Sequence, residues 1–350
     1  MPKIRHPILL LAIILGSTLV FPLVPVTATT IGCGSILNVS TTLKTNIGPC
    51  PGNGLVIGHN GIVLNCAGHT ISSTTGVRVG IFLSGKSKVT VENCIITGFA
   101  SGFLLTGSSS NKLIGNTANN NVNYGFHLTS SSSNTFTNNK VNPGVILDIA
   151  GFYLVSSNGN TFTRNSAVND GVGFYFVNSN ANTLTGNTGS ALYQGFILSG
   201  SSGNVLKRNI ASGSGSEGFV ISGSSNTLTS NTANNLYGID STVAYGFDIG
   251  GSSNTLNSNT ANSNVGVGFT ISGTSIILNS NTANGNDQDG FDMGGSSNTL
   301  TSNTANSNSG FGYYDPTTGT GTAGTANAYS LDECSLNSAG SSPTGLCAPQ

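Results

Sequence analysis

The sequence predicts an all-β fold, a single-stranded parallel β-helix in which each repeat of about 22 residues forms one turn of a solenoid. Short apolar stretches alternate with Ser, Asn and Gly clusters, as in residues 251–271, GSSNTLNSNTANSNVGVGFTI. This pattern is typical of short strands joined by turns, three to a repeat. Neither a regular leucine frame nor helix-forming stretches are present. A glycine followed by an apolar residue marks about eleven rungs, at Gly80, Gly102, Gly125, Gly151, Gly173, Gly195, Gly218, Gly246, Gly268, Gly290 and Gly310.

Two columns of asparagine accompany the glycines. Equivalent side chains stack in a coil whose rungs lie ~4.8 Å apart, so amides can bond from rung to rung. An inward Asn without partners would be costly to bury. We therefore interpret both columns as structural ladders rather than ligand-binding groups. The unbroken column contains Asn65, Asn93, Asn116, Asn139, Asn165, Asn187, Asn209, Asn231, Asn259, Asn281 and Asn303. The other, interrupted at Lys88 and Ile276, contains Asn60, Asn111, Asn134, Asn160, Asn182, Asn204, Asn226, Asn254 and Asn298.

Residues 1–28 have the pattern of a secretory signal peptide. Lys3 and Arg5 precede an apolar run over 7–25, and small residues follow at 26–28. A retained membrane anchor is the alternative, although prolines interrupt the run. No later run is apolar enough to span a bilayer. We therefore expect a protein without a membrane span after signal cleavage, located in the periplasm, outside the cell or on its surface.

The remaining chain divides into an N-terminal cap at 29–60, β-helix repeats at 61–316, and a linker with a disulfide-closed C-terminal cap at 317–350. Charged residues make up 7% of the chain, and removing Lys3 and Arg5 changes the formal net charge from −1 to −3. A nucleic-acid-binding protein would show a basic stripe, and none is present. We therefore expect no nucleic-acid partner.

Six cysteines follow the signal peptide, which favours disulfides with 15 possible connectivities. Cys66 and Cys94 each follow an Asn of the unbroken column, so they occupy one site on adjacent rungs, at a separation that disulfide geometry permits. The remaining cysteines would close the two ends of the coil, whose strand edges need protection. Thiolate metal sites are the alternative, but no CxxC spacing supports them. The end pairs are Cys33 with Cys50 and Cys334 with Cys347.

Several stretches resemble the right-handed parallel β-helix proteins of the NosD type. They are GLVIGHNGIVLNCAGHTI at 54–71, VTVENCIITGF at 89–99 and the SSNTLTSNTAN repeats, and the resemblance covers roughly 31–314. The namesake is a periplasmic accessory protein for copper loading of nitrous-oxide reductase. The same repeats resemble carbohydrate-binding proteins and sugar hydrolases that share the coil. The resemblance implies a right-handed coil, and either a copper accessory role or a polysaccharide role.

Neither implied activity has a complete set of residues in the sequence. Copper favours imidazole and thioether ligands. The chain after the signal peptide offers His59, His69, His127 and Met293, with no two at a ligand spacing. A polysaccharide lyase or hydrolase would need carboxylates gathered on one face.

Carboxylates cluster near the end of the repeats. Asp248 and Asp292 are the candidate catalytic pair, about 10 Å apart with Thr270 between them. Asp287, Asp289 and Asp292 are the candidate ligands of a calcium ion, the one cofactor that we consider. Solvated surface carboxylates are the alternative for all four aspartates.

The residue after each Gly-Phe pair should point outward, because side chains alternate along a strand. His127, Tyr153 and Tyr175 are the candidate ligand-binding residues, and the two tyrosines could stack on sugar rings. There are two alternatives to an exposed row of outward residues. A loop or the insertion at 141–150 would cover it, or the inward and outward assignment would be reversed. The expected stripe contains Phe82, Leu104, His127, Tyr153, Tyr175, Ile197 and Val220, and it changes to Asp248, Thr270 and Asp292.

The function that we favour from the sequence is non-catalytic binding or scaffolding, with a polysaccharide or an envelope component as partner. A protein partner stays open. The alternatives are a polysaccharide lyase or glycoside hydrolase, and a NosD-like copper accessory protein.

Overall fold

The computed structural model describes residues 30–142, 149–213, 215, 217–238 and 243–349. The chain divides into residues 1–30 and 31–350, and the fold belongs to the second part. The expected signal peptide at 1–28 lies outside the described residues, and so does most of the insertion at 141–150. Among the residues that the structure describes, no helix is both long and apolar enough to cross a membrane.

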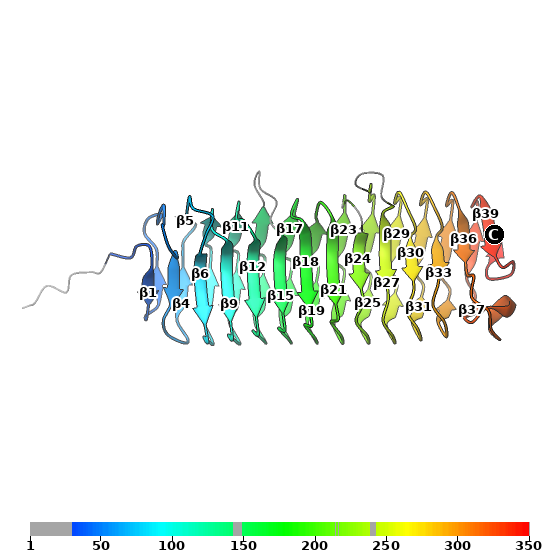
Figure 1. Ribbon diagram of the computed structural model, residues 1–350, viewed down its shortest axis with the longest axis horizontal. Helices are drawn as coiled ribbons and strands as arrows, with labels where there is room; N and C mark the ends of the chain where they lie inside the picture. The colour runs from blue at the N-terminus through cyan, green and yellow to red at the C-terminus, as the bar shows by residue number, and fades with distance from the viewer. Residues whose placement is uncertain (1–29, 143–148, 214, 216, 239–242, 350) are drawn as a thin grey trace, which may run out of the picture. The chain divides into compact units, whose positions relative to one another are not determined.

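The fold is the expected right-handed parallel β-helix, built from three parallel sheets that we call A, B and C (Figure 1). Each rung contributes one strand to each sheet, and each strand pairs with its equivalents in the rungs before and after it.

Sheet A consists of β1 (Ser35–Leu37), β3 (Leu55–Ile57), β6 (Val79–Ser84), β9 (Ser101–Thr106), β12 (Tyr124–Thr129), β15 (Ala150–Val155), β18 (Val172–Val177), β21 (Gln194–Ser199), β24 (Glu217–Ile221), β27 (Tyr245–Ile249), β30 (Phe269–Ile271), β33 (Phe291–Met293), β36 (Phe311–Tyr314) and β39 (Ala339–Ser342). Sheet B consists of β2 (Thr41–Thr42), β4 (Val63–Asn65), β7 (Thr90–Glu92), β10 (Lys112–Ile114), β13 (Thr135–Thr137), β16 (Thr161–Thr163), β19 (Thr183–Thr185), β22 (Val205–Lys207), β25 (Thr227–Thr229), β28 (Thr255–Asn257), β31 (Ile277–Asn279), β34 (Thr299–Thr301) and β37 (Ala328–Ser330). Sheet C consists of β5 (Thr70–Ser72), β8 (Ile95–Thr97), β11 (Thr117–Asn119), β14 (Lys140–Asn142), β17 (Ser166–Val168), β20 (Thr188–Ser190), β23 (Ile210–Ser212), β26 (Thr232–Asn234), β29 (Thr260–Asn262), β32 (Thr282–Asn284), β35 (Thr304–Asn306), β38 (Glu333–Ser335) and β40 (Ala348–Pro349).

The coil extends beyond the range 61–316 at both ends. In the described chain, about twelve turns have a strand in all three sheets, from β3–β5 to β36–β38. The strand β1 already pairs with β3, and β39 pairs with β36. The expected linker after residue 316 forms the connection between β36 and β37, with a short 3-10 helix at Thr322–Gly324. The expected caps are therefore largely further rungs.

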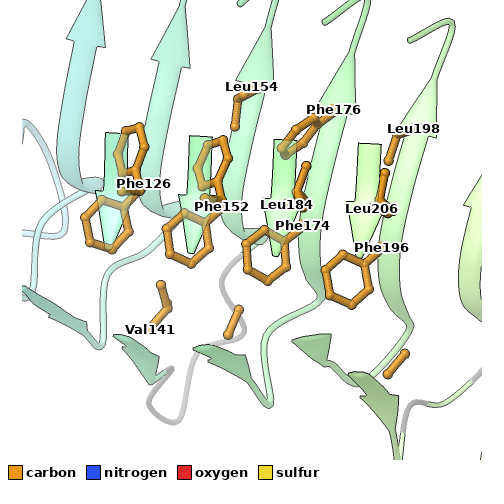
Figure 2. Packing of buried hydrophobic residues seen from close by; sticks show 14 of the residues in the cluster. Phe126, Val141, Phe152, Leu154, Phe174, Phe176, Leu184, Phe196, Leu198 and Leu206 are labelled. Carbon is orange, nitrogen blue, oxygen red and sulfur yellow. The ribbon is translucent and has the colours of Figure 1, made fainter. Parts of the chain in front are cut away.

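Stacked aromatic rings fill the core behind sheet A. Neighbouring rings of this column have centroids 4.5–4.9 Å apart and are nearly parallel. Four of them are visible in Figure 2, with leucines from sheets A and B packed above them. The separation equals the spacing of paired strands, so the parallel register itself places each ring on the next. The column contains Phe103, Phe126, Phe152, Phe174, Phe196, Phe219, Phe247, Phe269, Phe291 and Tyr313.

The glycine before each of these aromatic residues allows sheets A and C to approach closely. A Cβ added to Gly218 would lie 2.6 Å from the carbonyl oxygen of Gly246 and 2.7 Å from the Cβ of Ala233. Both distances are shorter than a normal contact. The repeating glycine is therefore a packing requirement of the corner between the two sheets.

The asparagines form hydrogen-bonded ladders, and Asn187 is a representative member. The backbone N–H and the side-chain Nδ2 of Asn165 donate to Asn187 Oδ1, at 2.8 and 3.0 Å. Asn187 Nδ2 donates to the Phe162 carbonyl at 3.0 Å and to Asn209 Oδ1 at 2.9 Å. Every polar atom of this buried amide therefore has a partner, as burial requires.

A third ladder was not predicted from the sequence. It lies at the corner between sheets C and A, where Nδ2 of each member donates to Oδ1 of the next at 3.0 Å. Its signal in the sequence is an Asn five residues after Asn259, Asn281 and Asn303, and another five residues after Asp332. The members are Asn264, Asn286, Asn308 and Asn337.

The ladders begin later than the sequence suggested. Asn65 ends β4 opposite Glu92, and Asn93 is exposed with a φ of 54°. The inward position belongs to Cys94, whose N–H donates to Asn116 Oδ1 at 3.0 Å. Asn60 is exposed too. The assignment of these three asparagines to the ladders is wrong, because the turns of the first rungs are spaced differently and an alignment by residue type slips.

Three disulfides join the same cysteine pairs that position in the sequence favoured. The Cα atoms are 5.4 Å apart in Cys33–Cys50, 4.7 Å in Cys66–Cys94 and 5.8 Å in Cys334–Cys347. Cys66 and Cys94 are fully buried. A covalent link between rungs thus stands where the unbroken Asn ladder has not yet begun.

Replacing Asn187 by Ala should lower the free energy of unfolding by about 3–5 kcal/mol, because four buried polar groups lose a partner. Denaturant unfolding followed by circular dichroism measures the change. The matched control is Asn279→Thr, since Asn279 lies outward and half-buried on sheet B beside Thr301, and its amide donates one hydrogen bond, to Asn257 Oδ1 at 3.1 Å. The control should change the unfolding free energy by less than about 1 kcal/mol, because only one partly exposed hydrogen bond is lost. Equal losses in both variants would contradict the ladder's role.

The unbroken ladder ends at Asp332, which is buried and accepts hydrogen bonds from the N–H and Nδ2 of Asn303, both at 2.8 Å. Burial raises the pKa of Asp332 to about 6. The folded protein therefore binds this proton more tightly than the unfolded chain. The stability contributed by the protonated acid is present below about pH 4 and is lost as the pH rises to about 6.

Asp332→Asn should therefore increase stability at pH 7 by up to about 3 kcal/mol relative to the parent, and by little at pH 3. Thermal or urea unfolding of both proteins across this pH range measures the difference, which isolates Asp332 from other carboxylates. A less stable variant at pH 7 would mean that the acceptor role of Asp332 Oδ2 toward the Ser330 N–H outweighs the cost of the buried charge.

Candidate functional site

The outward residues of sheet A form one column along the stack. Strand pairing places His127 opposite Tyr153, and Tyr153 opposite Tyr175. The residues on either side of each member are fully buried, whereas the members themselves are half-buried. The reversed inward and outward assignment is therefore wrong. The column contains Val56, Phe82, Leu104, His127, Tyr153, Tyr175, Ile197, Val220, Asp248, Thr270, Asp292 and Tyr314.

Four rings meet in the middle of this face, and we call Tyr124, His127, Tyr153 and Tyr175 the tyrosine cluster. Tyr124 stacks on Tyr153 with centroids 4.6 Å apart and planes at 9°. His127 lies 4.7 Å from Tyr124 and 5.3 Å from Tyr153, and Tyr153 lies 5.3 Å from Tyr175. The cluster spans three successive rungs.

Tyr124 was missed by the sequence reasoning. It occupies the first position of β12 and is half-buried like His127, although the two are three residues apart, because Gly125 and Phe126 between them are both buried and interrupt the alternation. Its signal was its place directly before Gly125, where other rungs have Ala150, Val172 or Gln194. The register pairs Tyr124 with Ala150, and only the ring contact shows that its side chain extends to Tyr153.

Burial favours the neutral form of three members of the tyrosine cluster. Burial lowers the pKa of His127, so the imidazole stays neutral. Burial, followed by the neighbouring phenols, raises the pKa of Tyr124 and of Tyr153. The His127 Nε2 and the Thr129 hydroxyl are within hydrogen-bonding distance at 3.1 Å. The cluster thus presents partly exposed ring surfaces with polar edges and no ionic group.

A pair of carboxylates follows the apolar members of the column. Glu217 begins β24, and Asp248 lies one rung further along on β27. Gln194 Nε2 donates to Glu217 Oε2 at 2.7 Å. Burial raises the pKa of both acids, and the charge of Asp248 raises the pKa of Glu217 further. The sequence reasoning missed Glu217, since it stands before the glycine rather than after the Gly-Phe pair.

The other predicted acidic residues lie toward the C-terminal end of sheet A. Asp292 is two rungs from Asp248 in the same column, with Thr270 between them. Burial, then the charges of Asp289 and Asp315, raises the pKa of Asp292. Asp289 Oδ1 accepts the Phe311 N–H at 2.6 Å.

Asp287 is exposed and precedes the strand. In the part of the chain that the structure describes, no group of three or more His, Cys, Asp or Glu side chains is arranged to hold a metal ion. Calcium binding by Asp287, Asp289 and Asp292 stays a prediction from the sequence.

The potential copper ligands do not converge. His59 is exposed near β4, His69 precedes β5 and bonds toward Asn46, and His127 belongs to the tyrosine cluster on sheet A. Met293 points inward and is fully buried. The described residues therefore do not fit a copper site, because no imidazole pair or imidazole and thioether pair shares a surface.

Asp248→Asn should lower the pKa of Glu217, because the nearby negative charge that opposes ionisation of Glu217 disappears. The titration of the Glu217 carboxyl, followed by NMR, measures the shift. Asp287→Asn is the control and should leave this titration unchanged, since Asp287 is exposed and several rungs away. An unchanged Glu217 titration in Asp248→Asn would show that the two carboxylates are not electrostatically coupled.

Several solved structures are similar to this chain. The periplasmic alginate epimerase AlgG is 16% identical, with a TM-score of 0.51 over 75% of this chain and 74% of that chain. DFA-IIIase from Arthrobacter chlorophenolicus A6 is 12% identical, with a TM-score of 0.48 over 71% and 66%. The A-module of the mannuronan C-5 epimerase AlgE4 from Azotobacter vinelandii is 15% identical, with a TM-score of 0.44 over 77% and 79%. At this identity the likeness to AlgG shows the fold alone.

No match was found among the curated proteins. A family model described as "Periplasmic copper-binding protein (NosD)" matches residues 27–188 and 144–244. Together these matches cover more than half of the 350 residues. The chain therefore belongs to the NosD family.

Proposed function

We propose that this protein binds glycans outside the cytoplasm, through the tyrosine cluster on sheet A and without cleaving them. The observation that carries the proposal is the contact of four uncharged rings, partly exposed, on one outward face. Such rings combine a flat apolar surface with hydrogen-bonding edges. A sugar ring has the matching chemistry, an apolar face of C–H groups bordered by hydroxyls.

The repeat of the rungs suits an extended polymer. Successive cluster members lie on β12, β15 and β18, so binding positions recur every ~4.8 Å along the stack. The apolar residues Ile197 and Val220 continue the same column beyond Tyr175. A chain of sugar units lying along the stack would contact several of these positions at once. The ligand that we infer is therefore a polysaccharide rather than a single sugar.

The charge of the face bears on the class of polysaccharide. The described strands of sheet A contain no Lys or Arg, while Glu217, Asp248 and Asp292 are carboxylates. A uronate polymer would meet only like charge there. We therefore propose a neutral or amino-sugar glycan. The alginate epimerase AlgG shares the fold, but alginate is an anionic polymer that this face would disfavour.

The three disulfides support a location in an oxidising compartment. The family description names the periplasm. We propose that the protein acts in the periplasm, outside the cell or on its surface, with a polysaccharide or envelope component as its partner. We propose no copper role for the coil, because its imidazole and thioether groups lie apart.

Catalysis is the competing function. Asp248 and Asp292 lie two rungs apart, or about 10 Å, slightly beyond the ~6.5–9.5 Å of inverting glycoside hydrolases. The coupled pair of Glu217 and Asp248 is a better candidate, since a raised pKa suits a carboxylic acid to proton donation. The binding experiment therefore includes an assay for cleavage.

The double variant Tyr153→Ala, Tyr175→Ala should bind the retained glycan at least about tenfold more weakly, because two ring surfaces are removed. Affinity electrophoresis in gels containing neutral, amino-sugar or uronate glycans measures the retention. Tyr237→Ala is the matched control, since Tyr237 is 51% exposed and lies outside the cluster. The control should be retained like the parent, and alginate should retain neither.

The same glycans are assayed for new reducing or unsaturated ends. Retention without new ends supports the proposal, and release of new ends would replace it by a lyase or hydrolase. If none of the glycans retains the parent protein, the proposed glycan binding is overturned and a protein partner is favoured.

A further inference from the structure

The outward face of sheet A changes from aromatic to acidic along the stack. The tyrosine cluster lies on β12, β15 and β18, Ile197 follows on β21, and carboxylates begin with Glu217 on β24 (Figure 1). Asp289 precedes Gly290 in the way that Glu217 precedes Gly218, which places it on the same face. Four half-buried carboxylates thus follow the rings, and we call them the acidic segment. Its members are Glu217, Asp248, Asp289 and Asp292.

No positive side chain compensates the acidic segment. Residues 209–350 contain no Lys, Arg or His. The nearest basic residues along the chain, Lys207 and Arg208, are exposed on sheet B and at its corner with sheet C. Within the described residues, the carboxylates of Asp248 and Asp292 have no hydrogen bond or salt bridge. The strongest acids of the face are therefore left without a partner in the protein.

The carboxylates also oppose each other's ionisation. Burial raises the pKa of Asp248 and of Asp292, and the charge of Asp289 raises the pKa of Asp292 further. A cation bound over the acidic segment would stabilise the ionised forms of all its members. Carboxylates perturbed by burial and by like charge are typical of functional sites. The acidic segment therefore indicates a positively charged ligand.

The face is continuous from the rings to the acids. Seven rung steps separate β12 from β33, which is ~34 Å at the ~4.8 Å spacing of paired strands. One hexose unit lengthens an extended polysaccharide by about the spacing of one rung. A chain that stacks on the tyrosine cluster and continues along the stack therefore passes over the acidic segment, with about one sugar unit to each rung.

We propose that the bound polysaccharide is cationic, an amino-sugar polymer in which some of the amines are free. Its sugar rings stack on the tyrosine cluster, and its protonated amines bind the carboxylates of Asp248 and Asp292, with Glu217 and Asp289 beside them. This inference rests on the proposed function and names the class of its ligand. The acidic segment is then the part of the face that selects free amines over acetylated ones.

Two other cationic ligands fit this face less well. Calcium takes about six to eight oxygen ligands around one point. In the part of the chain that the structure describes, no three acidic side chains are grouped to hold a metal ion. A basic peptide would be attracted by the carboxylates, but it would leave the tyrosine cluster in the same column without a role.

The test compares two oligomers of about seven sugar units, the length of the face. One is glucosamine with free amines, and the other is fully N-acetylated glucosamine. Isothermal titration calorimetry measures their affinity for the purified chain at about 0.1 M and about 1 M salt, where the Debye length is ~10 and ~3 Å. Circular dichroism and the unfolding midpoint first establish that every variant is folded.

The parent should bind the free-amine oligomer at least about tenfold more tightly than the acetylated one at low salt, because several charge pairs form. High salt should remove most of this preference by screening. Asp248→Asn with Asp292→Asn should lose the preference at low salt too. The matched control, Asp287→Asn with Glu333→Gln, removes the same charge from outside the column and should keep the preference.

A preference that persists in Asp248→Asn with Asp292→Asn, or that salt does not reduce, would overturn this inference and leave the proposed function standing. Tyr153→Ala with Tyr175→Ala should weaken the binding of both oligomers. Unchanged binding of both by that variant would instead contradict the proposed function. The two failures are therefore distinguishable.

Two further probes identify the other cationic ligands. Oligolysine of equal charge tests for a basic peptide. If it binds the parent as tightly as the glucosamine oligomer does, recognition is by charge alone and the amino-sugar ligand is overturned. Calcium is titrated without a glycan. Heat of calcium binding that Asp248→Asn with Asp292→Asn abolishes would replace the amine-binding role of the acidic segment by a metal site.

Discussion

The parallel pairing of each rung with the next is the constraint on which the rest of the structure depends. It places every side chain beside the side chain at the same position of the next rung. A residue type that repeats in a column must therefore pack or bond well with another residue of the same type. Phenylalanine satisfies this requirement by stacking, and asparagine does so because its amide is both donor and acceptor. A buried residue that could only donate or only accept would leave one partner unsatisfied at every rung. The repetitive composition of the chain follows from this requirement.

The sequence predicts this architecture well because two patterns can be read from it directly. One is the repeat of about 22 residues, and the other is the alternation of apolar and polar residues along each strand. The same alternation identifies His127, Tyr153 and Tyr175 as outward residues of one column. It fails where residue type misleads, as at Asn93, which resembles a ladder member although Cys94 holds the inward position. It also misses Tyr124 and Glu217, because the ring contact of Tyr124 with Tyr153 and the electrostatic effect of Asp248 on Glu217 cross between rungs. Such diagonal interactions depend on strand register and side-chain conformation, which a linear pattern does not contain.

Inward positions of this coil are restricted by stacking, whereas outward positions are not. The variation that matters for recognition is therefore expected on the outer faces, where sheet A changes from aromatic to acidic along its length. The family membership and the solved neighbours establish the coil, and one coil can host many activities. The functional argument rests instead on four rings, three carboxylates and the absence of Lys and Arg from the described strands of sheet A.

The uneven length of the rungs has a consequence for how such a protein changes over time. Two of the rungs longer than 22 residues have their extra residues at the same corner, between β14 and β15 and between β26 and β27, where sheet C leads into sheet A. The first two asparagine ladders and the phenylalanine stack continue past both insertions without a break. That corner borders the tyrosine cluster. New segments can therefore be inserted beside the tyrosine cluster while the coil is preserved, much as variable loops diversify on a constant antibody framework.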